Sequence, residues 1–292
     1  MRLGLFLVNI DVCATDPAAA VRIAVAAEAA GWESVWTGEH YVLPDPAVRA
    51  SPTPGDTPML DPFVTLGFLA AHTDTLRLGT GVTVVPVHHP LVLAKQVASI
   101  DRVSGGRFLF GVGVGYLEPE FRALGVPLDE RGSRMDDHLA AMRAVWSGAT
   151  EYEGRYTRFT GVRAEPRPLR AGGPPLHVGG YVAGSYRRAV TQGDGWYGFA
   201  LDPVGAEKAI GDLRAALARH ERPAGLGPLE ISVTPPRHLA LDDDTLAAYA
   251  VLGVTRLIAL PPRAGAGDAD VQVRFVEELG DRIDGHPDLA RG

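Results

Sequence analysis

Two side chains that can exchange protons stand together in this 292-residue sequence, directly after a short apolar segment. Glu39 and His40 follow Ser34-Val35-Trp36-Thr37-Gly38. Because histidine titrates near neutral pH, an adjacent carboxylate and imidazole are suited to general acid–base catalysis. An ordinary polar surface loop would contain the same two residues. The pair therefore becomes a candidate site only where the fold places it beside a ligand.

Glycines inside two expected strands are the second signal. Glycine occupies every second position at Gly79 and Gly81 in one strand, and at Gly111, Gly113 and Gly115 in the next. Glycine is unfavourable within a strand unless a ligand or another backbone must come close. Thr80 and Thr83 add hydroxyl groups that could bind a heterocycle. A flat ring, a packed neighbouring segment or a bulge would each account for these positions.

A possible phosphate site follows a later strand. Gly179-Gly180-Tyr181 leads into a predicted helix that carries Ser185 in its first turn. The free N–H groups and the dipole at a helix N-terminus attract phosphate. An ordinary strand-to-helix turn has the same features, so both interpretations stay open.

Composition argues against several kinds of partner. The formal net charge of −7 does not favour nucleic acid or an anionic membrane. No apolar run reaches the length of a membrane span. Asp11 and Asp16 interrupt the apolar N-terminus, which we interpret as a strand and not as a signal peptide. The single cysteine, Cys13, excludes an internal disulfide and is typical of the reducing cytoplasm, where we expect the protein.

Other catalytic machinery finds little support. His88 and His89 are adjacent and lack the i, i+4 spacing of helical zinc ligands, so we expect no metal. There is no Gly-x-Ser-x-Gly motif of a serine hydrolase. The two lysines, Lys95 and Lys208, fall in predicted helices, which argues against Schiff-base chemistry.

Eight apolar segments alternate with helix-like segments. We predict strands at Leu3–Val8, Ser34–Gly38, Leu76–Val84, Phe108–Val114, Leu176–Gly179, Gly195–Phe199, Glu230–Thr234 and Arg256–Leu260. Asp-Pro pairs at Asp16, Asp61 and Asp202 are typical helix starts. Strand–helix alternation with continuously apolar strands indicates an α/β fold with a parallel sheet covered on both faces. We predict a single TIM-type (β/α)8 barrel domain over residues 1–292, and an open doubly wound sheet is the alternative.

Three segments interrupt this alternation and are predicted insertions. Tyr41–Leu60 and Tyr116–Arg134 follow the second and fourth strands, at the end where barrel enzymes build their active sites. Glu151–Gly173 precedes the fifth strand, and we expect a hairpin around Glu153-Gly154-Arg155. The first two segments are therefore candidates for binding loops or lids.

The ordered set of motifs resembles the luciferase-like monooxygenase superfamily, and most of all its oxidoreductases that use the deazaflavin coenzyme F420. The motifs are Gly31-Trp32-Glu33-Ser34-Val35-Trp36 with Glu39-His40, Leu78-Gly79-Thr80-Gly81-Val82, Val103-Ser104-Gly105-Gly106-Arg107 with Gly111 to Gly115, and Gly179-Gly180 with Gly193-Asp194-Gly195-Trp196. They span about residues 1–200. The resemblance implies a barrel whose C-terminal mouth holds the isoalloxazine or deazaflavin ring.

The resemblance also implies roles for individual residues. His40, with Glu39 orienting it or sharing its role, would transfer the proton that matches the hydride. A non-prolyl cis peptide is expected at Gly81–Val82, in a bulge behind the ring. The cofactor-binding residues would be Thr80, Gly81, Val82, Thr83, Gly113, Gly115, Tyr116, Gly179, Gly180, Tyr181 and Ser185. The last four of these would hold the phosphate.

One position departs from the pattern. Sugar-phosphate dehydrogenases of this superfamily carry a catalytic glutamate just after the glycines of strand four, where this sequence has Tyr116. Glu118 and Glu120 lie nearby, and Glu120 is our candidate for the acid role. We therefore do not expect a sugar phosphate as the substrate.

The leading hypothesis is hydride transfer between coenzyme F420 and a small organic substrate. The first alternative is an FMN-dependent monooxygenase, which would use oxygen and a flavin reductase as its partner. A redox-inactive isomerase or aldolase and a non-catalytic cofactor carrier are further alternatives. Because members of the superfamily are commonly homodimers, we expect a homodimer.

Overall fold

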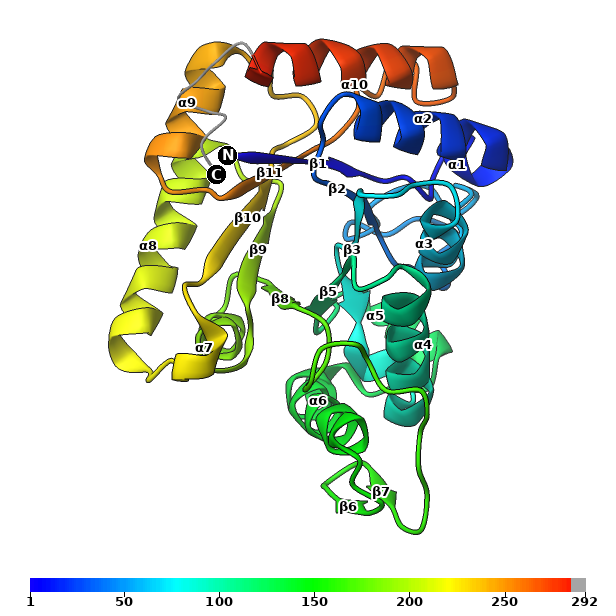
Figure 1. Cartoon of the computed structure of the whole chain (residues 1–292), viewed down its shortest axis with the longest axis vertical. Coiled ribbons are helices and arrows are strands. Elements are labelled where there is room, and N and C mark those ends of the chain that lie inside the picture. Colours follow the sequence, from blue (N-terminus) through cyan, green and yellow to red (C-terminus); the bar gives the residue numbers. More distant parts are fainter. Residues whose placement is uncertain (285–292) are drawn as a thin grey trace.

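Eight parallel strands close into a barrel in the computed structural model, which describes residues 1–284 (Figure 1). Around the barrel these strands follow the order β3-β2-β1-β11-β10-β9-β8-β5, and pairing of β5 with β3 completes the circle. The strands are β1 (Arg2–Phe6), β2 (Ser34–Thr37), β3 (Arg77–Thr80), β5 (Phe108–Gly113), β8 (Leu176–Gly179), β9 (Gly195–Phe199), β10 (Glu230–Thr234) and β11 (Arg256–Ala259). This closed sheet excludes the open doubly wound alternative.

Helices surround the barrel and connect successive strands (Figure 1). They are α1 (Val12–Thr15), α2 (Pro17–Ala29), α3 (Pro62–Ala70), α4 (Pro90–Val103), α5 (Glu118–Ala123), α6 (Arg131–Ser147), α7 (Ala183–Gln192), α8 (Pro203–Arg219), α9 (Asp243–Val251) and α10 (Ala269–Asp284). Short 3-10 turns lie at Val85–Val87, Leu128–Glu130 and Ala224–Leu226. Among residues 1–284, no helix is long and apolar enough to cross a membrane.

The predicted Asp-Pro helix starts are confirmed. The carboxylates of Asp16, Asp61 and Asp202 accept backbone N–H groups of the first turns of α2, α3 and α8. Each bond satisfies a donor that a helix leaves unpaired, while proline occupies the first helical position. α10 packs beside α2, where the indole of Trp32 donates to Val276 O at 3.0 Å (Figure 1). The last helix thereby covers the junction between β11 and β1.

Two apolar cores hold the barrel together. The larger core lies between the strands and the outer helices. The smaller one fills the barrel interior with Phe6, Trp36, Leu109, Tyr197 and Ile258. A Cβ at Gly79 would lie 2.4 Å from the Trp36 ring, so this strand glycine makes room for the indole and not for a ligand.

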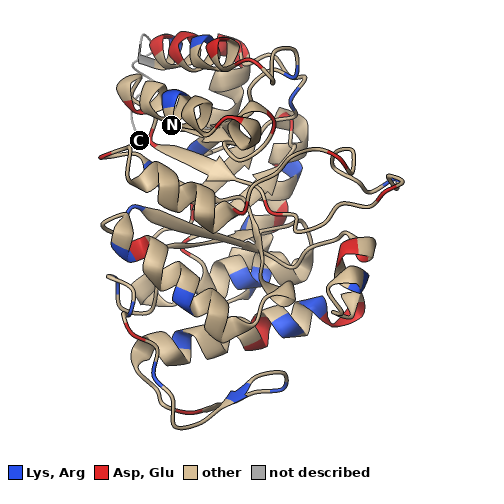
Figure 2. Ribbon diagram, turned by 90° about the vertical axis from the view of Figure 1, so that its right-hand side faces the viewer, with Lys and Arg blue, Asp and Glu red and all other residues tan. Residues whose placement is uncertain are grey.

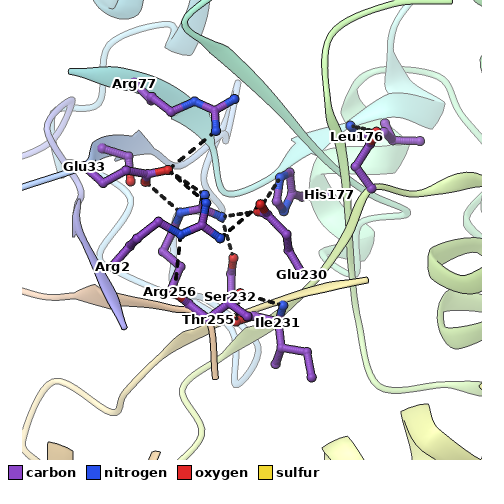
Figure 3. Close-up of polar contacts among 12 residues, drawn as sticks. Arg2, Glu33, Arg77, Leu176, His177, Glu230, Ile231, Ser232, Thr255 and Arg256 are labelled. Carbon is purple, nitrogen blue, oxygen red and sulfur yellow. Dashed lines mark hydrogen bonds and ion pairs between the residues drawn. The ribbon is translucent and has the colours of Figure 1, made fainter. Parts of the chain in front are cut away.

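An ionic cluster closes the N-terminal end of the barrel (Figure 3). Its members come from the first residues of the strands or from just before them: Arg2, Glu33, Arg77, His177, Glu230, Ser232 and Arg256. Arg256 is fully buried and forms two hydrogen bonds, 2.7 and 2.8 Å long, with the Glu33 carboxylate. Its remaining nitrogen bonds Glu230 at 3.1 Å and Ser232 at 3.0 Å. The buried charge is thus paired in every direction, as burial requires.

Most of the predicted strands begin and end within two residues of the observed strands. The expected strand Leu76–Val84 is divided, because the chain bulges at Gly81–Val82 between β3 and β4 (Thr83–Val84). The hairpin expected around Glu153–Arg155 is confirmed as β6 (Tyr152–Glu153) and β7 (Arg158–Phe159). The segment Tyr116–Arg134 is not a simple loop, because it contains α5 and a 3-10 turn. Acidic and basic residues are interspersed along the outer helices in the view of Figure 2.

Candidate functional site

His40 and Glu120 form a close pair at the C-terminal mouth of the barrel. Nδ1 of His40, three residues past β2, lies 2.9 Å from Oε2 of Glu120 in α5. The side chains are 12% and 2% exposed, so water has little access to the contact. The other oxygen of Glu120 accepts the backbone N–H of Tyr41 at 2.7 Å. A carboxylate held in this way fixes the orientation of the imidazole.

Glu39 faces a different partner. Its carboxylate oxygens lie 3.1 and 3.2 Å from Nε2 of His88, and Oε2 accepts the backbone N–H of Val84 at 2.5 Å. The side chains of Glu39 and His88 are only 2% and 6% exposed. Glu39 and His40 are adjacent in sequence, yet each is bonded to a residue from another segment. The carboxylate that contacts His40 is that of Glu120.

Two tyrosines stand beside these pairs. The ring of Tyr116 meets that of His40 edge-on at 6.0 Å, and the ring of Tyr41 meets that of His88 at 5.4 Å. Burial, with the negative charge of Glu120, raises the pKa of Tyr116. Burial, with the charges of Glu39, Asp61 and Glu120, raises the pKa of Tyr41. Both phenols therefore stay protonated and can donate hydrogen bonds.

The bulge between β3 and β4 borders the same mouth. The Gly81–Val82 peptide is cis, as the resemblance implied. The hydroxyl of Thr80 donates to Gly111 O at 2.7 Å, so it is already engaged within the barrel wall. The buried hydroxyl oxygen of Thr83 has no partner in the described residues. Of the two threonines, Thr83 is the one whose hydroxyl is not bonded to another described residue.

Other parts of the protein fill the space beside the alternating glycines of β5, so no open space is left there. A Cβ at Gly111 would lie 1.7 Å from Thr80 O, and one at Gly113 would lie 2.5 Å from the Val82 side chain. A Cβ at Gly115 would meet Val84 and Phe121, each at 2.6 Å. Of the interpretations left open for these residues, the packed neighbour is the one observed. They let the bulge lie against β5.

The expected phosphate segment lies at the start of α7. Gly180 has a φ of +120°, a conformation that favours glycine. Ser185 Oγ accepts the N–H of Val182 at 3.0 Å and donates to its carbonyl at 2.7 Å, which ties the first turn together. The hydroxyl of Tyr181 bonds the backbone of Phe199 across β9. Gly179 packs against Val82, so the bulge and the α7 turn are neighbours.

Asn9 connects the long segment after β2 to the barrel. Its side-chain N–H group donates to Gly38 O at 2.9 Å and to Leu60 O at 2.8 Å. Its oxygen accepts the N–H of Gly38 at 3.2 Å. One buried side chain therefore holds both ends of the segment 41–60, which carries Tyr41 beside the two acid–imidazole pairs.

The arrangement is suited to a planar, partly apolar ligand that takes up or gives up a proton. Exposed apolar or aromatic side chains follow the carboxyl ends of the strands at Tyr41, Val42, Tyr116, Tyr181, Val182 and Phe199. Exposed apolar side chains at this end of the barrel are candidates for contact with an apolar ligand. The unpartnered Thr83 hydroxyl, the α7 N-terminus and the His40–Glu120 pair supply polar groups. No three His, Cys, Asp or Glu side chains within residues 1–284 gather to hold a metal.

Sequence reasoning overlooked two residues of this site. The sequence offers His88 only as a zinc ligand, a role that its spacing excludes. Asn9 carried no signal, because only the closed barrel brings it to residues 38 and 60. For His88, proximity to the glycine-rich strand was the one available hint.

The whole described chain matches known proteins. Residues 1–285 match the family model of luciferase-like monooxygenases. An uncharacterized protein of Mycobacterium tuberculosis is 32% identical over 297 residues, covering 97% of this chain and 99% of the relative. The oxygenase component of the flavin-dependent trigonelline monooxygenase of Acinetobacter baylyi is 30% identical over 175 residues, covering 59% of this chain and 46% of that protein.

A solved structure shows the same fold. The coenzyme F420-dependent tetrahydromethanopterin reductase of Methanopyrus kandleri has a TM-score of 0.74 at 16% identity, covering 98% of this chain and 99% of that chain. Deazaflavin-dependent and flavin-dependent enzymes are thus both among the proteins that this chain resembles. On the match across residues 1–285, and on the barrel and mouth described above, the chain belongs to the luciferase-like monooxygenase family.

Proposed function

We propose that this protein transfers a hydride between coenzyme F420 and a small organic substrate at the C-terminal mouth of the barrel. The observation that carries the proposal is the buried contact between His40 and Glu120. Hydride transfer to a carbonyl or a similar group must be matched by a proton, and a carboxylate-held imidazole supplies one. The deazaflavin, when bound, supplies or accepts the hydride.

Glu120 defines which nitrogen of His40 reacts. Because Nδ1 faces Glu120 at 2.9 Å, Nε2 is the nitrogen left to exchange a proton with the substrate. The bond to the buried carboxylate also holds the ring in one orientation. Glu120 thus holds the proton donor in place, and His40 contacts the substrate.

Residues on three other segments would hold the cofactor. Val82 and Thr83 in the bulge would lie against the ring, and the Thr83 hydroxyl would bond its edge, since that group has no protein partner. The phosphate would meet the first N–H groups of α7, after Gly180. An F420-dependent reductase has the same fold, which is consistent with this coenzyme.

His40→Ala tests the proposed proton donor. We expect turnover of a reducible substrate with reduced F420 to fall by about 100-fold or more, because general acid catalysis contributes on this order. The F420 dissociation constant, measured by fluorescence titration, should change less than about twofold, since the ring is held by other segments. Unchanged turnover would remove His40 from the mechanism.

An FMN-dependent monooxygenase is the second candidate. Its supporting observation is the 30% identity with the oxygenase component of a flavin-dependent enzyme. Thermal unfolding of the purified protein with oxidised F420 or with FMN separates the two, because a ligand that binds the native state raises the unfolding temperature. A shift with FMN alone, together with oxygen consumption when reduced FMN is supplied, would replace the first proposal.

The lysines argue against the aldolase alternative. Lys95 lies on α4 and donates to Glu165 O, and Lys208 lies on α8 and pairs with Asp212. Both helices are on the outside of the barrel (Figure 1). A Schiff-base lysine therefore does not stand at the mouth.

A further inference from the structure

Glu39 is the acidic residue whose position differs most from the sequence-based expectation. It was expected to orient His40 or to share its proton, yet its carboxylate points to His88 and Val84. No hydrogen bond or ion pair joins it to His40. A buried carboxylate must have some other use, because its burial costs free energy unless its oxygens are bonded.

The three bonds of Glu39 converge on the bulge. Val84 is the last residue of β4, directly after Thr83 and two residues after the cis Gly81–Val82 peptide. His88 follows the 3-10 turn Val85–Val87 that leaves β4. One carboxylate at the end of β2 therefore holds β4 on one side and the start of the next connection on the other. Gly81 N–H, bonded to Thr37 O at 2.7 Å, attaches the beginning of the bulge to the same strand.

Besides Glu39, the pairing of β4 with β5 attaches the bulge to the barrel wall, with Thr83 opposite Val112 and Val84 opposite Gly113. Thr83 Oγ1 is buried without a partner, and Val82 packs over Gly113 and Gly179 through side-chain contact alone. The N–H of Val84 is held by Glu39. Removing the carboxylate would leave that N–H without an acceptor in a site that water reaches poorly, and would leave Nε2 of His88 with the Tyr41 hydroxyl at 3.4 Å. An unpaired buried donor is costly, so the bulge would move to satisfy it.

We propose that Glu39 is a positioning residue: with His88 it fixes the β3–β4 bulge in the shape that receives the cofactor ring, and it takes no part in proton transfer. This inference rests on the proposed function for the identity of the ring. The two neighbouring residues thus have different roles: His40 transfers the proton, and Glu39 holds the bulge on which the ring would lie.

The first arm of the test uses the cofactor-free protein and hydrogen–deuterium exchange of the peptide that spans residues 81–88. In Glu39→Ala, the Val84 amide should exchange about tenfold faster or more, because it loses its acceptor. Glu39→Gln keeps an oxygen for Val84 N–H and an amide that can donate to His88. Its exchange should stay within about threefold of the wild type. Equal exchange in Glu39→Ala and the wild type would overturn the proposal.

The second arm measures coenzyme affinity and turnover separately. Glu39→Ala should raise the F420 dissociation constant about tenfold or more, and at saturating F420 its kcat should stay within about threefold of the wild type. Glu39→Gln should restore most of the affinity. A fall in kcat with unchanged affinity would assign Glu39 to the reaction and overturn the proposal.

His88→Phe and His89→Phe form a matched pair. His88→Phe keeps a ring against Tyr41 but removes the contact with Glu39, so we expect weaker F420 binding with kcat retained. His89 is exposed, and its ring accepts the N–H of Leu91 at the start of α4, so His89→Phe should leave F420 binding unchanged. Equal effects of the two would contradict a specific role for His88.

Failure of the proposed function gives a different result. A wild-type protein that binds neither F420 nor FMN would overturn that function and the statement that the bulge receives a ring. The exchange arm would still decide whether Glu39 holds the bulge. Binding of FMN alone would move the affinity measurements to FMN and keep the inference.

Discussion

At the scale of residues, the site depends on which neighbours two adjacent side chains find. Glu39 and His40 are consecutive, but the closed barrel surrounds one with His88 and Val84 and the other with Glu120 and Tyr116. Sequence proximity suggested a dyad between them. Three-dimensional proximity replaces it with two dyads, because consecutive residues of an extended chain point in opposite directions. Residue types were therefore predictable here, while their partners were not.

Glu120→Gln tests the role assigned to the His40 partner. The amide removes the negative charge beside the His40 ring but still accepts the N–H of Tyr41, so the fold should persist. We expect kcat to fall at least about tenfold with little change in F420 affinity. Glu118 is the matched control, because it lies on the same helix, is exposed and forms an ion pair with Arg122 on the surface. Equal losses in Glu118→Gln and Glu120→Gln would exclude a specific role for Glu120.

At the scale of elements, the sequence predicts the strands and the helix starts, but it does not predict how segments pack at the C-terminal mouth of the barrel. Apolar runs and Asp-Pro pairs are local signals, so β10 (Glu230–Thr234) and the Asp202 cap were predicted correctly. The use of the β5 glycines depends on which segment lies across them, which is a long-range contact. A ring and a packed bulge leave the same pattern in the sequence, and only the structure distinguishes them.

Gly111→Ala tests that packing. Its Cβ would lie 1.7 Å from the backbone oxygen of Thr80, which cannot move without shifting β3. We expect the free energy of unfolding to fall by about 1–3 kcal/mol, the usual cost of overpacking. Gly211→Ala is the control, since its Cβ meets no atom within 4 Å on the exposed face of α8. The control should gain about 0.5–1 kcal/mol, as measured by urea unfolding. Equal stability of Gly111→Ala and the wild type would contradict the observed close approach.

At the scale of the whole molecule, chemistry and stability occupy opposite ends of the barrel. The candidate site lies at the carboxyl ends of the strands, and the Arg256 cluster lies at their amino ends (Figure 3). Burial alone would raise the pKa of Glu33, but hydrogen bonds from Arg256 and its charge lower it to about 2. Burial, with the positive charge of Arg256, lowers the pKa of His177 to about 3. The folded cluster therefore holds Glu33 charged and His177 neutral.

These shifts predict a loss of stability in acid. Because the pKa of His177 is lower in the folded protein than its ordinary 6.5, the unfolded chain binds the extra proton. Stability from this group is complete above pH 6.5 and falls toward pH 3. Glu33 adds a loss in the same direction below its ordinary pKa of 4.5. At pH 5 the His177 contribution to the loss is about 2 kcal/mol.

His177→Leu isolates that contribution. The free energy of urea unfolding should fall between pH 7.5 and pH 5 by about 2 kcal/mol less in the variant than in the wild type. The exposed His72 offers the control, because His72→Leu should leave the wild-type pH dependence unchanged. A variant with the full wild-type pH dependence would show that His177 is protonated equally easily in both states.

Asn9 has a consequence for how this barrel can acquire new substrates. Because the single buried side chain of Asn9 bonds both residue 38 and residue 60, the 21 residues from Glu39 to Met59 begin and end at the same point of the barrel. The cost of closing a chain segment grows only slowly with its length. Most of this segment can therefore be replaced, in evolution or by design, as long as Asn9, Glu39 and His40 are kept. Such a replacement would change which substrates enter the site without changing the strands of the barrel.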